Sequence, residues 1–418
     1  MKITCYHFFS ILFVVSLTSC NGHSNNSTSS KKNESQSKTY NESAVKNANS
    51  NFKQGQDYVE FKRARILDKI GFTEPVEACS ILIPEQWKFE ADILWNAPGT
   101  ACAGNNMSIK SVSPDGKYSF ELLPNFLWSF MTDPQLNEFN RQQQYPKYCS
   151  YGEPMNAMDY FKNVFAPNDL GNPEIVDIKE NTKGQELLNE QAELGRMKMM
   201  QNSGMQVNNY TTFVTATVKY SPSQEALVLC GVIITESLIP NQYNGTYSKS
   251  YISVATERMV FKYPVGQKDK ATNMLSVMMA SIRTNTNWKN AVDGFWEGVR
   301  DQSRAAHLGR INAMDAQTAQ MGRDAINKGQ QNLNNMDSNM RSWEAKQQSQ
   351  DKMHTNFIKT IREVENYSDA TGKVELASGY NHAWSRSDGT SFIMSDNPNF
   401  DPSSVFQDQQ WKEMKKVD

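Results

Sequence analysis

The cysteines are the residues of this 418-residue chain whose type and position most directly suggest chemistry. Six are present, and one of them, Cys20, closes the segment Leu17-Thr18-Ser19-Cys20 at the end of a short apolar run. The small side chains before it fit a narrow peptidase cleft, and its thiol can accept a diacylglycerol group. These features make Cys20 a candidate for acylation.

Four cysteines, Cys79, Cys102, Cys149 and Cys230, remain once Cys5 is removed with the leader and Cys20 is acylated. An oxidising compartment permits disulfides, and four cysteines allow three complete pairings. Cys102 and Cys149 both lie in loops punctuated by Gly, Pro and Tyr, so we predict a bridge between them, with Cys79 bonded to either one as the alternative. Cys230 lies in an apolar run and is expected to be a buried thiol. The absence of a Cys-x-x-Cys spacing disfavours zinc-ribbon and thioredoxin-like sites.

Histidine is scarce, which limits the acid–base chemistry open to the chain. Beyond the first 23 residues the sequence contains His307, His354 and His382. The first two fall in a helical stretch, so His382 is the best candidate for a general base. The sequence lacks the Gly-x-Ser-x-Gly nucleophile elbow of hydrolases, the His-Glu-x-x-His motif of zincins, and the glycine-rich P-loop and dinucleotide-binding motifs. We therefore predict no catalytic residue, metal ligand or cofactor, and no particular Asp or Glu stands out as half of a glycosidase pair.

Aromatic residues indicate where a ligand could bind. Trp128 and Phe130 follow directly on a predicted strand, and His382 and Trp384 lie close together near the C-terminus. Such side chains can line a groove for an apolar or sugar ligand, so these four are the candidate groove residues. For Trp128 and Phe130, burial in the core is the competing interpretation and the favoured one.

The composition permits a folded core but says little about partners. Hydrophobic residues make up 38% of the chain, which excludes a collagen-like or wholly disordered protein. Lys and Arg number 43 against 45 Asp and Glu, a net charge of −2. Because proteins that bind nucleic acid usually present a basic face, no nucleic-acid partner is predicted.

The elements that would place these residues begin with a leader and a tether. The apolar run of residues 8–17 is too short to cross a hydrocarbon core about 30 Å thick, so residues 1–19 are predicted to be a signal peptide. With Cys20 they resemble the lipobox of bacterial lipoproteins, and this resemblance implies that Cys20 becomes the lipidated N-terminus after cleavage. An ordinary secretory signal is the alternative. Residues 20–57 hold the anchor site and a disordered tether rich in Ser, Asn and Lys. Asn21 is not the Asp that resembles an inner-membrane retention signal, so we expect the outer membrane of the bacterial envelope.

Residues 58–288 are predicted to form one α+β domain with a mainly antiparallel sheet and helices packed on one or both faces. Segments 76–83 and 88–95 are expected to be successive antiparallel strands, and Ser113-Pro114-Asp115-Gly116 is a strong hairpin signal. The most strand-rich part spans 210–263, and helices are expected over 186–200 and 271–283. The order of elements resembles the PsbP/Mog1-type fold, although without a diagnostic motif.

Two smaller units follow the α+β domain. Residues 289–366 contain no proline and are predicted to form a long helical arm, through which residues 289–364 could join copies of the chain into a homo-oligomer. Low-complexity disorder near residues 300–350 is the alternative. Residues 367–418 are predicted to form a small β hairpin unit, with Trp411 in a short helix, that packs on the arm or on the main domain. The stretch from Trp343 through Gly379-Tyr380 to Asp401-Pro402 resembles the C-terminal region of uncharacterised bacterial envelope proteins.

The sequence therefore predicts a lipid-anchored envelope protein, held to the membrane by its N-terminal lipid, that binds an envelope protein, a cell-wall component or a small ligand. This non-enzymatic hypothesis rests on the anchor, the tether and the missing catalytic motifs. An envelope hydrolase that acts on glycan or peptide through carboxylates or His382 is the alternative.

The lipid anchor can be tested with one substitution. We expect the Cys20→Ser variant to lack diacylglycerol and to leave the membrane fraction, because no thiol remains to be acylated. Mass spectrometry of the purified chain and fractionation of the envelope measure the two effects, and Cys5→Ser in the leader is the matched control. Continued membrane fractionation of the Cys20→Ser variant would refute the assignment.

Overall fold

The computed structural model describes residues 52–100, 102–203, 207–240 and 247–307, and then the shorter segments 364–369, 372–377, 380–387, 389–406 and 410–417. The predicted leader, Cys20 and nearly all of the tether lie outside these residues. So do His354 and most of the predicted helical arm, of which the described part is the N-terminal helix. Among the helices that the structure describes, none combines the length and apolar character required to cross a bilayer.

The described residues form a mixed α/β structure whose sheets are mainly antiparallel, as the sequence predicts. The largest sheet has nine strands. Its main path runs through β3 (Lys88–Asn96), β4 (Gly104–Val112), β5 (Ser119–Leu122), β11 (Tyr247–Pro264), β10 (Gln224–Pro240), β9 (Val207–Ser221) and β8 (Glu174–Glu180). β6 (Phe126–Met131) pairs with the first half of β11, and β7 (Cys149–Tyr151) runs parallel to β6.

A second sheet joins the two ends of the described chain. Its strand order is β12 (Arg283–Thr284), β2 (Val76–Pro84), β1 (Val59–Asp68), β16 (Ser391–Ser395), β15 (His382–Arg386) and β17 (Trp411–Glu413). Because β16 pairs with β1 in register, from Val59 opposite Met394 onward, the C-terminal unit extends a sheet of the main domain. A third sheet contains β14 (Gly372–Ala377), β13 (Val364–Asp369) and β18 (Lys415–Val417).

Two expectations from the sequence are wrong. Segments 76–83 and 88–95 are not paired with each other, since β2 lies in the six-stranded sheet and β3 in the nine-stranded one. β2 is buried along almost its whole length, so it has apolar neighbours on both faces, and the turn closed by the Trp87 N–H on the Pro84 carbonyl carries the chain to the other sheet. Trp411 lies in the edge strand β17, not in a helix, because its segment pairs with β15.

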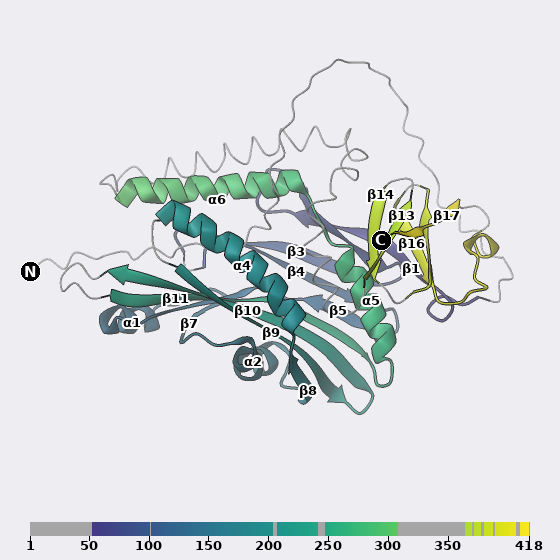
Figure 1. Ribbon diagram of the computed structural model, residues 1–418, viewed down its shortest axis with the longest axis horizontal. Coiled ribbons are helices and arrows are strands. Elements are labelled where there is room, and N and C mark those ends of the chain that lie inside the picture. Colours follow the sequence, from purple (N-terminus) through teal and green to yellow (C-terminus); the bar gives the residue numbers. More distant parts are fainter. Residues whose placement is uncertain are drawn as a thin grey trace, which may run out of the picture.

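Helices cover both faces of the nine-stranded sheet. Figure 1 shows α4 (Thr182–Ser203) and α6 (Thr286–His307) on one side of the long strands β9, β10 and β11, with α2 (Ala157–Tyr160) on the other. α5 (Lys268–Ala280) shares the first side with the six-stranded sheet, and together they enclose the larger apolar core. α2 continues through the π-helical turn η1 (Phe161–Phe165) into α3 (Ala166–Asp169) and encloses the smaller core. The short α1 (Pro134–Arg141) follows β6 and starts at the N-cap Asp133.

The helix predicted over residues 186–200 is confirmed as α4, and it lies close to the sheet at two glycines. A Cβ added at Gly184 would lie 2.7 Å from Cγ of Phe213, and one at Gly231 would lie 2.9 Å from Cδ2 of Leu188. Neither distance is compatible with a side chain, so the approach of α4 to β9 and β10 depends on both glycines.

A buried carboxylate joins the six-stranded sheet, the nine-stranded sheet and α6. Asp68, at the end of β1, has no exposed surface. One of its oxygens accepts from the Gly71 N–H at 2.8 Å and the Ile70 N–H at 3.1 Å, and the other accepts from the indole N–H of Trp288 at 2.9 Å. The indole N–H of Trp95 in β3 lies within 3.2 Å of both oxygens. Four donors thus replace water around one negative charge, which is the condition for a stable buried carboxylate.

Asp68→Asn tests this cluster, because an amide would direct its own N–H groups at donors that already need an acceptor. We expect the free energy of unfolding to fall by about 2–4 kcal/mol, measured by urea denaturation followed by tryptophan fluorescence. The matched control is Asp92→Asn, at an exposed pair 3.4 Å from Lys69, where a change below about 0.5 kcal/mol is expected. Equal effects at the two positions would contradict the role given to Asp68.

Candidate functional site

The candidate site begins with a β-bulge in β11. The register between β10 and β11 shifts so that Glu257 and Arg258 together oppose Cys230. One extra residue in a strand places two successive side chains on the same face. Thr256 and Glu257 therefore both line a cavity on one side of the sheet, while Arg258 turns to the other side and Met259 returns to the first.

The cavity has a volume of about 230 Å³. It lies between the nine-stranded sheet and the elements that cover this face, with walls from β3, β4, β11, β2, α5 and α6. Apolar side chains form much of the wall, among them Ile93, Val254, Ile282 and Val292. Polar groups interrupt it, including the amides of Asn105, Asn125 and Gln191. An apolar cavity with a few polar groups is the usual form of a small-molecule site.

Unfavourable backbone conformations gather around this cavity. Of the described residues, four that are not glycine have positive φ, namely Cys102 (55°), Tyr148 (64°), Asn172 (55°) and Glu257 (53°). All except Asn172, a residue type that tolerates this conformation, line the cavity. Each such residue costs about 1–3 kcal/mol and persists only where the surrounding structure imposes it, and such residues cluster at functional sites.

Glu257 is the chemically unusual group of the cavity. Burial raises the pKa of its carboxyl to about 7. Among the described residues no group donates a hydrogen bond to this carboxyl, and no cation compensates its charge. The other acid that lines the cavity, Asp293 of α6, is bound 2.5 Å from Nζ of Lys289. Glu257 thus presents an unpartnered carboxyl that can be either protonated or charged near neutral pH.

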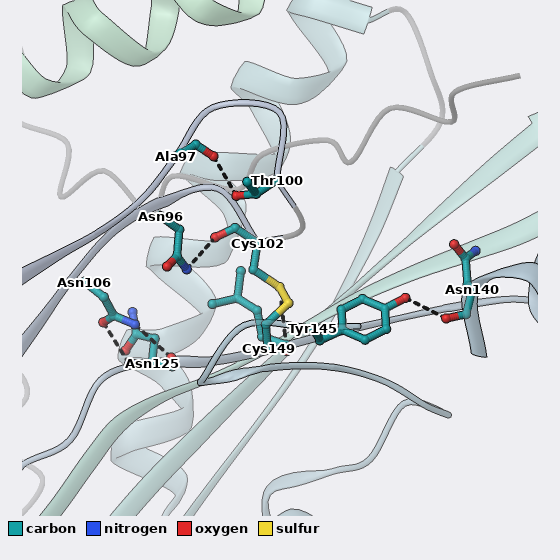
Figure 2. The surroundings of a disulfide bond; sticks show 10 residues. Asn96, Ala97, Thr100, Cys102, Asn106, Asn125, Asn140, Tyr145 and Cys149 are labelled. Carbon is teal, nitrogen blue, oxygen red and sulfur yellow. Dashed lines mark hydrogen bonds between the residues drawn. A yellow bond between two sulfur atoms is a disulfide. The ribbon is translucent and has the colours of Figure 1, made fainter. Parts of the chain in front are cut away.

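The disulfide bond forms part of the cavity wall. Cys102 is bonded to Cys149, as predicted from their loop positions, with their Cα atoms 6.0 Å apart. Figure 2 shows the bridge joining the loop between β3 and β4 to the start of β7, with the side-chain amide of Asn96 donating to the Cys102 carbonyl at 3.1 Å. The alternative partner Cys79 is a free, buried thiol that also lines the cavity.

The free thiols have the inert character expected of buried cysteines. Burial raises the pKa of Cys79 far above its ordinary value, and it raises that of Cys230 to about 12. Sγ of Cys79 lies 3.3 Å from Sδ of Met107, a soft apolar contact. Because the thiolate is the reactive species, neither cysteine is a candidate nucleophile.

Arg258 occupies the opposite face of the same bulge. Its side chain is fully buried, forms an ion pair with Asp169 of α3, and donates to the Pro124 carbonyl at 2.5 Å. Its guanidinium lies 4.7–6.0 Å from the ring centroids of Phe126, Tyr148, Tyr160 and Phe165. Arg258 therefore has the partners that Glu257 lacks, and it fixes the direction in which the bulge presents Glu257.

The predicted groove residues are not brought together. Trp128 of β6 is buried in the smaller core and stacks on Tyr160, with ring centroids 5.2 Å apart, while Phe130 lies beside Tyr251. His382 and Trp384 are in β15 of the other sheet, where Trp384 packs in a separate aromatic cluster. The core interpretation therefore holds for Trp128, and the four residues do not line one groove.

His382 lies at the surface of the C-terminal unit. Its ring stacks on Trp384, and Nδ1 is 3.7 Å from a carboxylate oxygen of Glu413, whose side chain is 64% exposed. His382 does not line the cavity. The residue proposed from sequence as a general base therefore lies outside the candidate site.

A second carboxyl group with a raised pKa, that of Glu60, lies outside the cavity. Burial, followed by a hydrogen bond with Glu85, raises the pKa of Glu60 to about 8, and the charge of Arg386 opposes this shift. Glu60 lies in β1 opposite Ile393 of β16, at the contact between the main domain and the C-terminal unit. The Glu60 carboxyl therefore lies at the pairing of β1 with β16 and not at the candidate ligand site.

The sequence contained a signal for Glu257 that its strand pattern concealed. Glu257 and Arg258 are adjacent charges inside the run 250–263, in which Lys262 is the one other charged residue. Strict alternation from Val254 and Thr256 would turn Glu257 away from the cavity and Arg258 toward it, and the bulge reverses these two directions. Because nothing in composition marks a bulge in a long apolar strand, the site residue could be found only from the register.

No family model, curated protein or solved structure matches this chain. The resemblances to bacterial lipoproteins, to the PsbP/Mog1-type fold and to envelope proteins therefore stay predictions from the sequence. Within the described residues no group of three or more His, Cys, Asp and Glu side chains is placed to hold a metal ion.

The raised pKa of Glu257 predicts how the stability of the protein depends on pH. The pKa of about 7 in the folded state exceeds the ordinary value of 4.5, so the folded state holds this proton more tightly than the unfolded state. Its contribution to stability is complete below pH 4.5 and is lost as the pH rises through 7. Glu257→Gln cannot ionise, so it should match the wild type at pH 4.5 and exceed it at pH 8, by at most about 3 kcal/mol.

Urea denaturation of both proteins at the two pH values measures this difference. Other titrating groups, including Glu60, are common to both proteins and cancel in the comparison. A destabilised Glu257→Gln variant at pH 8, or a difference that does not depend on pH, would show that the carboxyl is not held in an unfavourable environment.

Proposed function

We propose that the protein is a lipid-anchored binding protein of the bacterial cell envelope whose small ligand occupies the cavity around Glu257. The anchor is inferred from the lipobox-like residues Leu17-Thr18-Ser19-Cys20 and from the Ser/Asn-rich tether that follows. An oxidising compartment agrees with the disulfide between Cys102 and Cys149. The arm over residues 289–364 stays a candidate surface for self-association.

One observation carries the binding function. Three residues with unfavourable positive φ, Cys102, Tyr148 and Glu257, surround the same cavity, and one of them directs an unpartnered carboxyl into it. Both features cost stability, and a chain selected for stability alone has no reason to combine them. A bound ligand that engages the carboxyl supplies such a reason.

The size and lining of the cavity limit the ligand. A volume of about 230 Å³ is below the range of about 300–1,000 Å³ that is common for drug-sized molecules. The ligand is therefore a small molecule or one terminal group of a larger one. Its body would contact apolar walls such as Val254 and Val292, and its polar group would meet Glu257 and the amides.

Filling the cavity tests this function. Val254→Phe adds a ring where the small side chain of Val254 now lines the cavity. The wild type and the variant would be extracted from their own envelope in mild detergent and then denatured, and the released small molecules compared by mass spectrometry. We expect a compound in roughly stoichiometric amount from the wild type and at least a tenfold loss from the variant.

Val265→Phe, the same change at a position that is 46% exposed just beyond β11, is the matched control and should retain the compound. Circular dichroism must show that both variants are folded. Equal recovery from the wild type and Val254→Phe, or no bound compound in either, would contradict a ligand in this cavity.

The hydrolase alternative also has a specific observation in its favour. Glu257 and Asp293 line one cavity, and glycoside hydrolysis uses two carboxyl groups that flank the substrate. A carboxyl with a pKa of about 7 is suited to general acid catalysis at neutral pH. Incubation with purified peptidoglycan separates the two functions: soluble fragments whose release Glu257→Gln abolishes favour hydrolysis, and their absence favours binding.

A further inference from the structure

We propose that the ligand of this cavity is a small organic cation whose ammonium group pairs with Glu257 while its aliphatic body contacts the apolar walls. The inference rests on the proposed binding function and adds the chemical class of the ligand. It depends on the position of the Glu257 carboxyl, the charges around it and the character of the walls.

The charge balance of the cavity favours a cation. Two acids and one base line it, and the base, Lys289, is already paired with Asp293 at 2.5 Å. Arg258, the neighbour of Glu257 in the chain, is turned to the other face and is paired with Asp169. When Glu257 is ionised, the described lining therefore carries one uncompensated negative charge. The side chain is half-buried, and a carboxylate partly removed from water is stabilised by a cation or by several donors.

The geometry of the bulge aims this charge into the cavity. Thr256 and Glu257 lie on the same face because of the extra residue, and Glu257 is held there with φ of 53° by the pairing of β10 and β11 on either side. Regular alternation would have turned residue 257 away from the cavity. The strand departs from its regular form in a way that brings a carboxyl to the cavity.

The walls suit an organic cation better than a metal ion. Of the described residues, no three His, Cys, Asp or Glu side chains cluster as ligands, so a metal ion would lack the protein donors it needs. Ile93, Val254, Ile282 and Val292 instead offer aliphatic contacts, and the Trp288 side chain adds an aromatic surface. Aliphatic and aromatic contacts are those that the body of an alkylammonium ion makes favourably.

The other groups that could titrate beside Glu257 are few. The cavity is also lined by Cys79 of β2, by Tyr148 before β7, and by Lys289 and Asp293 of α6. Burial keeps the Cys79 thiol protonated at neutral pH, and Lys289 and Asp293 compensate each other. Between pH 6 and pH 8 the charge of the described lining thus changes at Glu257, whose pKa is about 7. A cation that needs the carboxylate must displace this proton, so its affinity should fall about tenfold from pH 8 to pH 6.

The test uses n-pentylammonium as the probe, with 1-pentanol as a neutral analogue and pentanoate as an anionic one. Binding to the full-length lipoprotein in non-ionic detergent would be measured by isothermal titration calorimetry. At pH 8 we expect n-pentylammonium to bind the wild type at least tenfold more tightly than Glu257→Gln, about 1.4 kcal/mol. The affinity of 1-pentanol should be the same for both proteins, which also controls for partition into the micelles.

Proton release supplies a second measurement that needs no variant. In two buffers with different heats of ionisation, n-pentylammonium binding to the wild type should release close to one proton at pH 6 and almost none at pH 8. This result would support the pairing with Glu257 even if Glu257→Gln did not fold.

Three results would overturn the proposal. One is equal affinity of n-pentylammonium for the wild type and Glu257→Gln, and another is binding without proton release at pH 6. The third is preferential binding of 1-pentanol or pentanoate that Val254→Phe abolishes, which would leave a ligand cavity in place but exclude a cation as its ligand. The compound recovered from the native protein tests the cavity itself, so failure of the binding function is distinguished from failure of the cation inference.

Discussion

The β-bulge opposite Cys230 is the constraint on which the candidate site depends. One extra residue in β11 moves Glu257 to the cavity and Arg258 to the smaller core, so a single irregularity determines the environment of two charges on opposite faces of the sheet. The buried Arg258 has a carboxylate, a carbonyl and four aromatic rings as partners. Those contacts would be lost if the bulge moved along the strand, so the partners of Arg258 also hold Glu257 in position.

The surrounding strands are interrupted at the same point. β5 pairs with β11 from Met259 onward and β6 pairs with it up to Ala255, so the change of partner falls at the bulge. The Leu123 N–H bonds to the Arg258 carbonyl at 2.8 Å and bridges this gap. β7 and the disulfide add a second connection from β6 to the loop after β3. The cavity therefore lies where regular pairing stops, which is where a sheet has room for a ligand without losing its core.

Local patterns in the sequence predicted local structure well. The Asp-Gly turn, the long strand-rich run and α4 all follow from composition or spacing within short windows. The bridge between Cys102 and Cys149, 47 residues apart, was predicted from the loop character of the two segments. What failed was long-range. The separation of β2 from β3 depends on the burial of β2 on both faces, which the pattern of one segment does not specify. Trp128 and Trp384 likewise pack in different clusters, and the packing partners of a side chain are not set by alternation within its strand. Glu257 was missed because alternation assumes an unbroken strand, and a bulge changes which side chains face inward without altering composition.

Two carboxyl groups in this protein, the fully buried Asp68 and the half-buried Glu257, have opposite environments, and the contrast carries information about function. Asp68 accepts hydrogen bonds from two backbone and two indole N–H groups, so its charge is compensated by donors of the fold itself. Glu257 has no such donors among the described residues, and burial alone raises its pKa to about 7. A carboxylate that joins structural elements is satisfied by the chain, as Asp68 is. A carboxylate held in a strained conformation beside a cavity, with its nearest cations paired elsewhere, is instead completed by a group that the chain does not contain.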